Sequence, residues 1–231
     1  MSKKHKPADE QTVGQLQALG YQDGVKHENG ERPLLVCDVD EVVLHLVDPF
    51  VQVLDERGFY LKSHSFRLTG NVFHKQTHEE ATQDDVWAGL DQLFKEQDKR
   101  QALVDGAVAA LNEISSSIDI LFLTNMPHDY GDLRKEHLAN HGLHHPLVTN
   151  TGSKVPAIQI IQRARSGRIG FIDDTPINLE QVRDGLDGVD IFHFMANEDF
   201  RRMAGKIDKA LISTGHWPSA ARAISDTLSM I

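Results

Sequence analysis

The sequence predicts an α/β fold, with a Rossmann-like parallel sheet as the core and one inserted, mainly helical segment. Short apolar runs that fit strands alternate with amphipathic stretches that fit helices, and this alternation is typical of βαβ units around a parallel sheet. One connection, residues 44–100, is too long for an ordinary strand-to-helix loop and has helical patterns of its own. We therefore expect one α/β core that is interrupted once.

The elements of the core follow in order along the chain. Apolar runs fit strands at Leu34–Asp38, Ile118–Leu123, Leu147–Asn150, Ile169–Ile172 and Val189–Phe194. Amphipathic patterns fit helices at Val13–Leu19, Ala102–Ile114, Asp132–His141, Pro156–Arg165, Asn178–Leu186, Glu198–Leu211 and Ser219–Met230. The first strand is apolar until its last residue, so we expect it to be fully buried.

These elements divide the chain into three parts. We expect residues 1–10 to form a disordered tail, because the start of the chain is polar. Residues 11–43 and 101–231 form the expected core, and residues 44–100 form the insertion.

The insertion has recognisable helices at both ends. An amphipathic helix is expected to end near Gly58, and a second one carries Trp87 and begins at a cap on Thr82 or Asp84. The stretch between them, Phe59–His74, mixes aromatic and β-branched residues, and its pattern assigns no structure.

The composition limits the kinds of partner. The 231 residues are 40% hydrophobic, enough for a sizeable core, and the formal net charge of −10 argues against binding a nucleic acid polymer or an anionic membrane. The polar start is not a signal peptide, and no apolar run approaches the roughly 18 residues of a membrane span. The single cysteine, Cys37, excludes an intrachain disulfide. We expect a soluble, cytoplasmic protein.

Two carboxylates, Asp38 and Asp40, stand two residues apart where the first strand ends. Burying a charge is costly unless a cation or a paired group compensates it. The pair therefore predicts a metal site or a reactive site at the C-terminal edge of the sheet, where open α/β folds bind their ligands.

Later strand ends and helix starts carry further polar residues, namely Thr124, Asn125, Lys154, Asp173 and Asp174. Because parallel strands bring their carboxyl ends to one edge of the sheet, we expect these residues to converge on one cleft.

The expected cleft has the ligands of a magnesium site. The carboxylates of Asp38 and Asp173, with a backbone carbonyl near Asp40, are hard oxygen ligands of the kind that Mg²⁺ prefers. Asp174 would either ligate the ion directly or orient a water.

The remaining residues suit a phosphate group. Lys154 supplies a fixed positive charge. The Thr124 hydroxyl and the Asn125 backbone N–H lie where we expect a helix to begin, and helix starts bind phosphate oxygens. Together with a divalent cation and a free carboxylate, this set predicts phosphoryl transfer.

Four ordered segments resemble the motifs of the haloacid dehalogenase (HAD) superfamily: D-V-D-E-V-V at 38–43, L-F-L-T-N at 121–125, S-K-V-P-A-I at 153–158 and F-I-D-D at 171–174. The first and fourth are specific together, and the shared order strengthens the other two. The resemblance covers about residues 34–195. It implies a HAD-like core, and residues 44–100 fall where this superfamily places a C1-type cap.

The resemblance implies a role for each residue. Asp38 would be the nucleophile that forms an aspartyl-phosphate, and Asp40 would protonate the leaving oxygen and then deprotonate the attacking water. Lys154 would neutralise charge on Asp38 and on the phosphate. Mg²⁺ would be held by Asp38, the Asp40 carbonyl and Asp173, with Asp174 beside them. The phosphoryl oxygens would be bound by Thr124, Asn125 and Lys154.

Asp40 also indicates the type of reaction. The resemblance implies phosphatase or phosphomutase chemistry, because dehalogenases of this superfamily do not keep a second aspartate at this position. Bacterial receiver domains also combine acidic residues, Thr and Lys on a parallel sheet, but their acidic pair comes early and their Lys last. Here Asp173 and Asp174 follow Lys154, which argues against that alternative.

Three positions depart from the superfamily pattern. Glu41 stands where many members have Gly, Val42 where many have Thr, and His45 where many small-molecule phosphatases have Asp. The run D-V-D-E-V-V-L-H at 38–45 also resembles the first motif of phosphatases that act on protein tails, although those enzymes generally lack so large an insertion at this point. The helix that follows, with Phe50, resembles deoxyribonucleotidases instead.

We therefore expect Mg²⁺-dependent hydrolysis of a small phosphorylated substrate, a phosphate monoester, with the cap closing over the site. A 5′-nucleotidase-type activity, a phosphomutase and a non-catalytic metal-binding regulatory module are the alternatives. The last helix is expected to pack on the sheet, and a homodimer contact is the alternative for it.

Other reactive residues have simpler explanations. Cys37 fits a small buried residue one step before the reactive carboxylate. The cluster of His141, His144 and His145 matches no common zinc spacing and fits a solvated helix end.

Overall fold

The computed structural model describes residues 5–62 and 70–229. Within them the main sheet has six strands, and all neighbours run parallel in the order β5-β4-β1-β6-β7-β8. The central strand is β1, whose Cys37 pairs with Phe122 of β4 and Ile172 of β6. The predicted Rossmann-like sheet is confirmed. Its strands are β1 (Leu34–Cys37), β4 (Asp119–Asn125), β5 (Leu147–Asn150), β6 (Ile169–Asp173), β7 (Val189–Phe194) and β8 (Ser213–Thr214).

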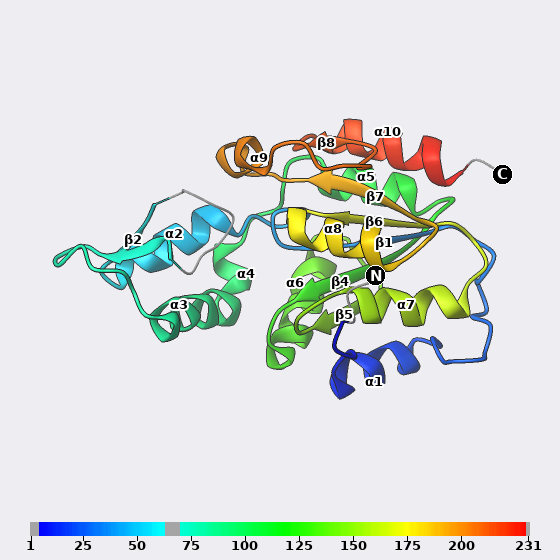
Figure 1. Ribbon diagram of the computed structural model, residues 1–231, viewed down its shortest axis with the longest axis horizontal. Coiled ribbons are helices and arrows are strands. Elements are labelled where there is room, and N and C mark those ends of the chain that lie inside the picture. Colours follow the sequence, from blue (N-terminus) through cyan, green and yellow to red (C-terminus); the bar gives the residue numbers. More distant parts are fainter. Residues whose placement is uncertain (1–4, 63–69, 230–231) are drawn as a thin grey trace.

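Helices cover both faces of the sheet (Figure 1). Successive residues of a strand point to opposite faces. Leu34 and Val36 of β1 thus pack with α1, α7 and α8, whereas Leu35 and Cys37 pack with α5, α6 and α10. This is why all of β1 is buried. The core helices are α1 (Glu10–Ala18), α5 (Ala107–Ile114), η1 (His128–Tyr130, a 3-10 turn), α6 (Gly131–Asn140), α7 (Val155–Ala164), α8 (Pro176–Gly185), α9 (Glu198–Ala204) and α10 (Trp217–Leu228).

Between β1 and α5, the described part of residues 47–100 forms a lobe at the side of the sheet (Figure 1). Its own hydrophobic core includes Phe50, Leu90 and Phe94. Two short antiparallel strands account for both ends of the unassigned stretch Phe59–His74, and residues 63–69 of that stretch lie outside the described part of the chain. The elements of the lobe are α2 (Val47–Glu56), β2 (Phe59–Leu61), β3 (Val72–His74), α3 (Gln83–Lys95) and α4 (Gln97–Arg100).

The two longer helices of the lobe end and begin where their sequences predict. Helix α2 ends at Glu56, and Gly58 follows with φ of 83°, a left-handed conformation that suits glycine. Helix α3 begins with a capping box: the Asp85 N–H donates to the Thr82 hydroxyl, and the Asp85 carboxylate accepts from the Thr82 N–H. Thr82, rather than Asp84, is therefore the cap.

Several boundaries differ from expectation. The helix expected to begin at Ala102 begins only at Ala107, because Gly106 precedes it at φ of 80°. Helix α1 begins at Glu10, inside the tail expected over residues 1–10, because the side chain of Asp9 accepts the N–H of Thr12 and caps the helix. The helix expected to reach Leu211 ends with α9 at Ala204, since Gly205 follows at φ of 63° and turns the chain out of the helix.

Helix α10 packs on the sheet, as expected from its sequence. Trp217, Ala220, Ile224 and Leu228 form one buried face, and the Trp217 indole N–H donates to the carbonyl of Val42 at 2.8 Å. Within residues 5–62 and 70–229, no helix combines the length and the hydrophobicity that a membrane crossing requires.

Candidate active site

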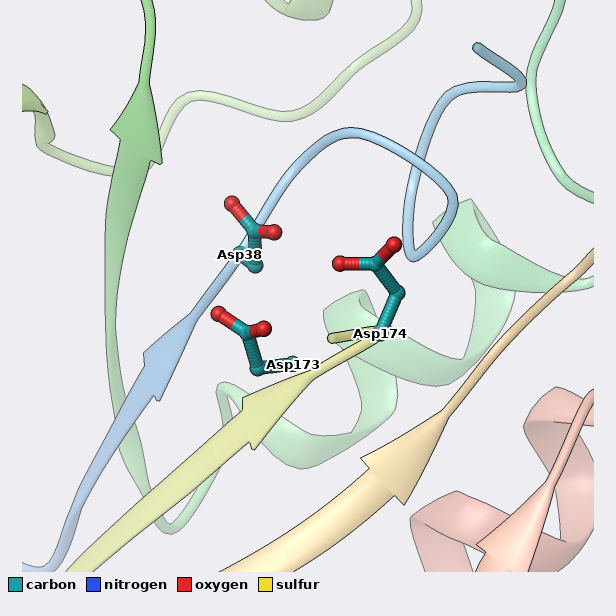
Figure 2. A group of neighbouring side chains, drawn as sticks. All are labelled: Asp38, Asp173 and Asp174. Carbon is teal, nitrogen blue, oxygen red and sulfur yellow. The ribbon is translucent and has the colours of Figure 1, made fainter. Parts of the chain in front are cut away.

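Three carboxylates meet at the carboxyl ends of two neighbouring strands. Asp38 directly follows β1, Asp173 is the last residue of β6, and Asp174 comes next. Each offers an oxygen within 4.8 Å of the oxygens of the other two. Figure 2 shows the three side chains gathered at the ends of the two strands. The parallel pairing of β1 with β6 brings them together, because it aligns the ends of both strands.

A single ammonium group lies inside this cluster. Lys154, the N-cap residue of α7, is 1% exposed, and its Nζ lies 2.7 Å from Asp38 Oδ1 and 2.7 Å from Asp173 Oδ2. The lysine is thus a buried part of the site. One positive charge faces three carboxylates, so the site keeps an excess of negative charge.

The pKa values reflect burial first and the neighbouring charges second. Burial raises the pKa of Asp38 to about 7, with Lys154 opposing and Asp173 adding to the shift. Burial, followed by the charges of Asp173 and Asp38, raises the pKa of Asp174 well above its usual range. Burial alone would lower the pKa of Lys154, but the two carboxylates outweigh it and raise that pKa. A divalent cation would compensate the surplus charge, and carboxylate oxygens are the ligands that Mg²⁺ prefers.

The two adjacent aspartates of β6 have different surroundings. Asp173 is fully buried, and both of its oxygens are engaged: Oδ2 accepts from Lys154, and Oδ1 accepts from the Thr175 N–H at 2.9 Å and from Asn178 Nδ2 at 3.0 Å. Asp174 lines the cavity in front of the cluster and accepts one bond, from the Thr175 hydroxyl at 2.9 Å. Asp174 is therefore better placed than Asp173 to ligate a metal ion directly.

Asp40 lies on the same cavity but outside the three-carboxylate cluster. Its Oδ1 accepts from Arg134 Nη1 at 2.9 Å and from Gln101 Nε2 at 2.8 Å. The guanidinium of Arg134 is buried and also donates to Gln97 and to Gln101. The network joins Asp40 to the end of the lobe and to α6.

Sequence reasoning missed Arg134, Gln97 and Gln101. They lie 33 to 94 positions from their partners across the lobe, α6 and the first strand, so no local pattern connects them. The spacing of Gln97 and Gln101, four apart, is the one local hint that both side chains share a face.

Thr124 and Asn125 are placed differently from the expectation. No helix begins at these residues, because β4 continues through Asn125 and α6 starts only at Gly131. The hydroxyl of Thr124 is fully buried and has no hydrogen-bond partner among the groups the structure describes, and Thr124 is not among the residues that line the cavity. The Asn125 side chain donates to the carbonyl of Gly152 at 2.9 Å and thereby shapes the loop before Lys154.

The backbone explains the unusual residue at position 41. Glu41 has φ of 58°, a left-handed conformation that glycine adopts without strain. Its buried carboxylate offsets the strain by accepting three backbone N–H groups, from Leu46 and Val47 at 2.7 Å and from Asn197 at 2.9 Å. Glu41 thereby ties the loop of Asp38 to the start of α2 and to the loop before α9.

The other candidates play no part in the cluster. Burial raises the pKa of the Cys37 thiol well above its usual value, which suits a structural residue. Among the residues that the structure describes, the three carboxylates are the one group of His, Cys, Asp or Glu side chains arranged to hold a metal ion. The histidines around His141 do not belong to this group.

No family model matches the sequence, and no curated protein matches it. Solved structures do resemble it along most of its length. A HAD family hydrolase from Deinococcus radiodurans R1, with bound phosphate and sodium, superposes with a TM-score of 0.60 and 16% identity, covering 86% of this chain and 97% of that one. The chain has the HAD fold.

Two further HAD-fold structures match at a TM-score of 0.54. The HAD-hydrolase YfnB from Bacillus subtilis, bound to magnesium, shares 12% identity and covers 87% of this chain and 100% of that one. A protein from Thermotoga maritima named as a beta-phosphoglucomutase shares 13% identity and covers 85% and 100%. At these identities the likeness extends to the fold, and the chemistry must be argued from the site.

Proposed function

We propose that this HAD-fold protein is a Mg²⁺-dependent phosphatase, which hydrolyses a phosphate monoester through an aspartyl-phosphate on Asp38. The observation that carries the proposal is the buried contact of Lys154 with both Asp38 and Asp173, beside the carboxylate of Asp174, which lines the cavity. A nucleophile held by a lysine within an excess of negative charge is suited to a metal-bound phosphoryl group. The fold shared with hydrolases that bind phosphate or magnesium supports the same conclusion.

Each residue has a defined part in the proposed reaction. A carboxylate oxygen of Asp38 attacks phosphorus, the bond from phosphorus to the ester oxygen breaks, and Asp40 gives its proton to that oxygen. A water then attacks the phosphorus of the aspartyl-phosphate, Asp40 takes its proton, and phosphate leaves with Asp38 restored. Lys154 and the Thr124 hydroxyl bind the charged phosphoryl oxygens, as does the backbone of Asn125.

The proposed metal ligands are Asp38, Asp174 and the backbone carbonyl of Asp40. Asp173, whose oxygens are already engaged, holds Lys154 in place from behind. When bound, the ion would neutralise phosphoryl charge and act as a Lewis acid.

We also propose that residues 44–100 act as the cap and close over the cavity, excluding water from the site. Helix α3 of the lobe lines the same cavity as Asp38 and Asp174, as this requires. The substrate that we propose for this cavity is a small phosphorylated molecule rather than a nucleic acid polymer.

The test is Mg²⁺-dependent release of phosphate from p-nitrophenyl phosphate and a panel of other esters. We expect turnover that EDTA abolishes, and loss of turnover in Asp38→Asn. The exposed Asp187→Asn is the matched control and should keep the wild-type rate. Wild-type turnover in Asp38→Asn would refute the nucleophile. Transfer to a sugar hydroxyl without free phosphate would indicate a phosphomutase, and metal binding without any turnover would indicate a regulatory module.

A further inference from the structure

A cavity of about 570 Å³ lies between the lobe and the core, in front of the carboxylates. This is larger than a phosphoryl group needs, and it falls within the range of pockets that enclose whole small molecules. Its polar end is formed by Asp38, Asp40, Lys154 and Asp174. The apolar part of its lining consists of Leu46, Trp87, Leu90, Phe94, Met126 and Pro127.

The charges in the cavity restrict the leaving group. Among the lining residues that the structure describes, Lys154 is the one cationic side chain, and its ammonium group already contacts Asp38 and Asp173. The remaining polar lining residues, such as Asn125 and Asn178, are neutral. Among the described lining residues, a second phosphate or a carboxylate on the substrate would find no further positive side chain and would meet apolar side chains, which is unfavourable.

Trp87 gives the apolar wall its specific character. It lies on one helical stripe with Leu90 and Phe94, three and seven positions later. The latter two are 8% and 5% exposed and belong to the core of the lobe, whereas Trp87 is 53% exposed and continues their stripe into the cavity. An accessible indole on the wall of a cavity is a stacking surface for a flat ring, and its two side-chain torsions cost little to order.

From this cavity we infer that the substrate is a phosphate monoester whose leaving group carries a neutral aromatic ring, which stacks on Trp87. The inference rests on the proposed phosphatase function and names the substrate class of that same site. Hydrolysis would break the bond between phosphorus and the ester oxygen and add one water, giving inorganic phosphate and an aromatic alcohol. A nucleoside and a phenol-like alcohol both meet this description.

The kinetic test compares four esters with Mg²⁺ present. Thymidine 5′-monophosphate and 1-naphthyl phosphate represent the two aromatic sources, while glucose 6-phosphate and phosphoglycolate represent a neutral sugar and a second anion. We expect at least one aromatic ester to exceed both of the others in kcat/KM by about tenfold or more, in line with the strength of ring stacking.

Variants then locate the effect. Trp87→Ala should lower kcat/KM for the preferred aromatic ester by about tenfold and change that for glucose 6-phosphate less than about twofold, because only the former loses a stacking partner. Trp87→Phe should restore most of the loss. The control is Leu211→Ala, which removes another apolar side chain, 52% exposed, that does not line the cavity.

Fluorescence gives a readout that is independent of turnover. The chain has two tryptophans, Trp87 and the fully buried Trp217. In Asp38→Asn protein, thymidine 5′-monophosphate should quench the emission, whereas inorganic phosphate should not. Adding Trp87→Phe should remove the quenching.

The outcomes separate the two proposals. Equal kcat/KM for aromatic and non-aromatic esters, or an equal loss on all of them in Trp87→Ala, overturns the substrate class and leaves the phosphatase intact. If no ester is hydrolysed, the proposed function fails, and quenching of Trp87 alone then decides whether the cavity takes an aromatic ligand.

Discussion

Asp174→Asn should make the metal-free protein more stable, although it removes a proposed metal ligand. The side chain keeps its shape, and Asn can still accept the bond from the Thr175 hydroxyl. The variant removes one negative charge from a cluster whose oxygens lie within 4.8 Å of one another. At that distance, with an effective dielectric constant of about 20, each pair of full charges repels by about 3.5 kcal/mol.

Protonation limits how much of this repulsion is felt. Burial raises the pKa of Asp174, so the folded protein destabilises its charged form, and wild-type stability falls as the pH rises above the unfolded value of about 3.9. The penalty is at most about 1.36 kcal/mol for each pH unit above that value. This gives a ceiling of about 5.6 kcal/mol at pH 8 and about 1.5 kcal/mol at pH 5.

Urea denaturation in EDTA measures the effect directly. We expect Asp174→Asn to exceed the wild type by about 2–5 kcal/mol at pH 8 and by less than about 1.5 kcal/mol at pH 5. Saturating Mg²⁺ should stabilise the wild type by about 2.7 kcal/mol at one hundred times its Kd, and the variant by much less. Asp187→Asn, an exposed control, should stay within about 0.5 kcal/mol of the wild type. A metal-free Asp174→Asn protein that is no more stable than the wild type would refute the electrostatic reasoning.

Three further predictions concern the surroundings of the site. Arg134→Met should lower the free energy of unfolding by about 3–5 kcal/mol in urea denaturation and lower kcat, because it removes the buried guanidinium that pairs with the carboxylate of Asp40. Unchanged stability would contradict this. Glu41→Gln should lower the free energy of unfolding by about 1–3 kcal/mol in the same assay, because a side-chain amide cannot accept all three backbone N–H groups. An unchanged urea midpoint would show that these three N–H groups do not depend on the carboxylate. Burial raises the pKa of Asp9, but the hydrogen bonds from Thr12 outweigh burial and lower that pKa. The ionised side chain of Asp9 therefore stabilises the fold above about pH 4, and this stabilisation is lost on acidification. Asp9→Ala should lower the free energy of unfolding by about 1 kcal/mol at pH 7, and the difference from the wild type must vanish in strong acid.

The central features of the fold were predictable because they follow from local pattern and parallel topology. The run Leu34–Cys37 is apolar throughout, and the structure buries it on both faces of the sheet. Once β1 lies between β4 and β6, the ends of these strands must meet at one edge. That step brings together Asp38 and Asp173 from positions 135 apart in the sequence.

Features that depend on long-range side-chain contacts were not predictable. The adjacent Asp173 and Asp174 look alike in sequence, and only the bonds from Lys154 and Asn178 show that the former is engaged. The bond from Arg134 to Asp40 spans 94 positions and joins elements with no shared pattern. In the lobe, β2 and β3 have three residues each, too few for strand alternation to be recognised.

The most direct test of the account is to trap the covalent intermediate. Protein mixed briefly with Mg²⁺ and 1-naphthyl phosphate or p-nitrophenyl phosphate is quenched in acid, and borohydride then reduces any aspartyl-phosphate to homoserine, which peptide mass spectrometry locates. We predict homoserine at position 38, dependent on Mg²⁺ and absent without the ester. Turnover of the ester with position 38 unmodified, or with the label on Asp40 or Asp174, would contradict the assignment of Asp38 as the nucleophile.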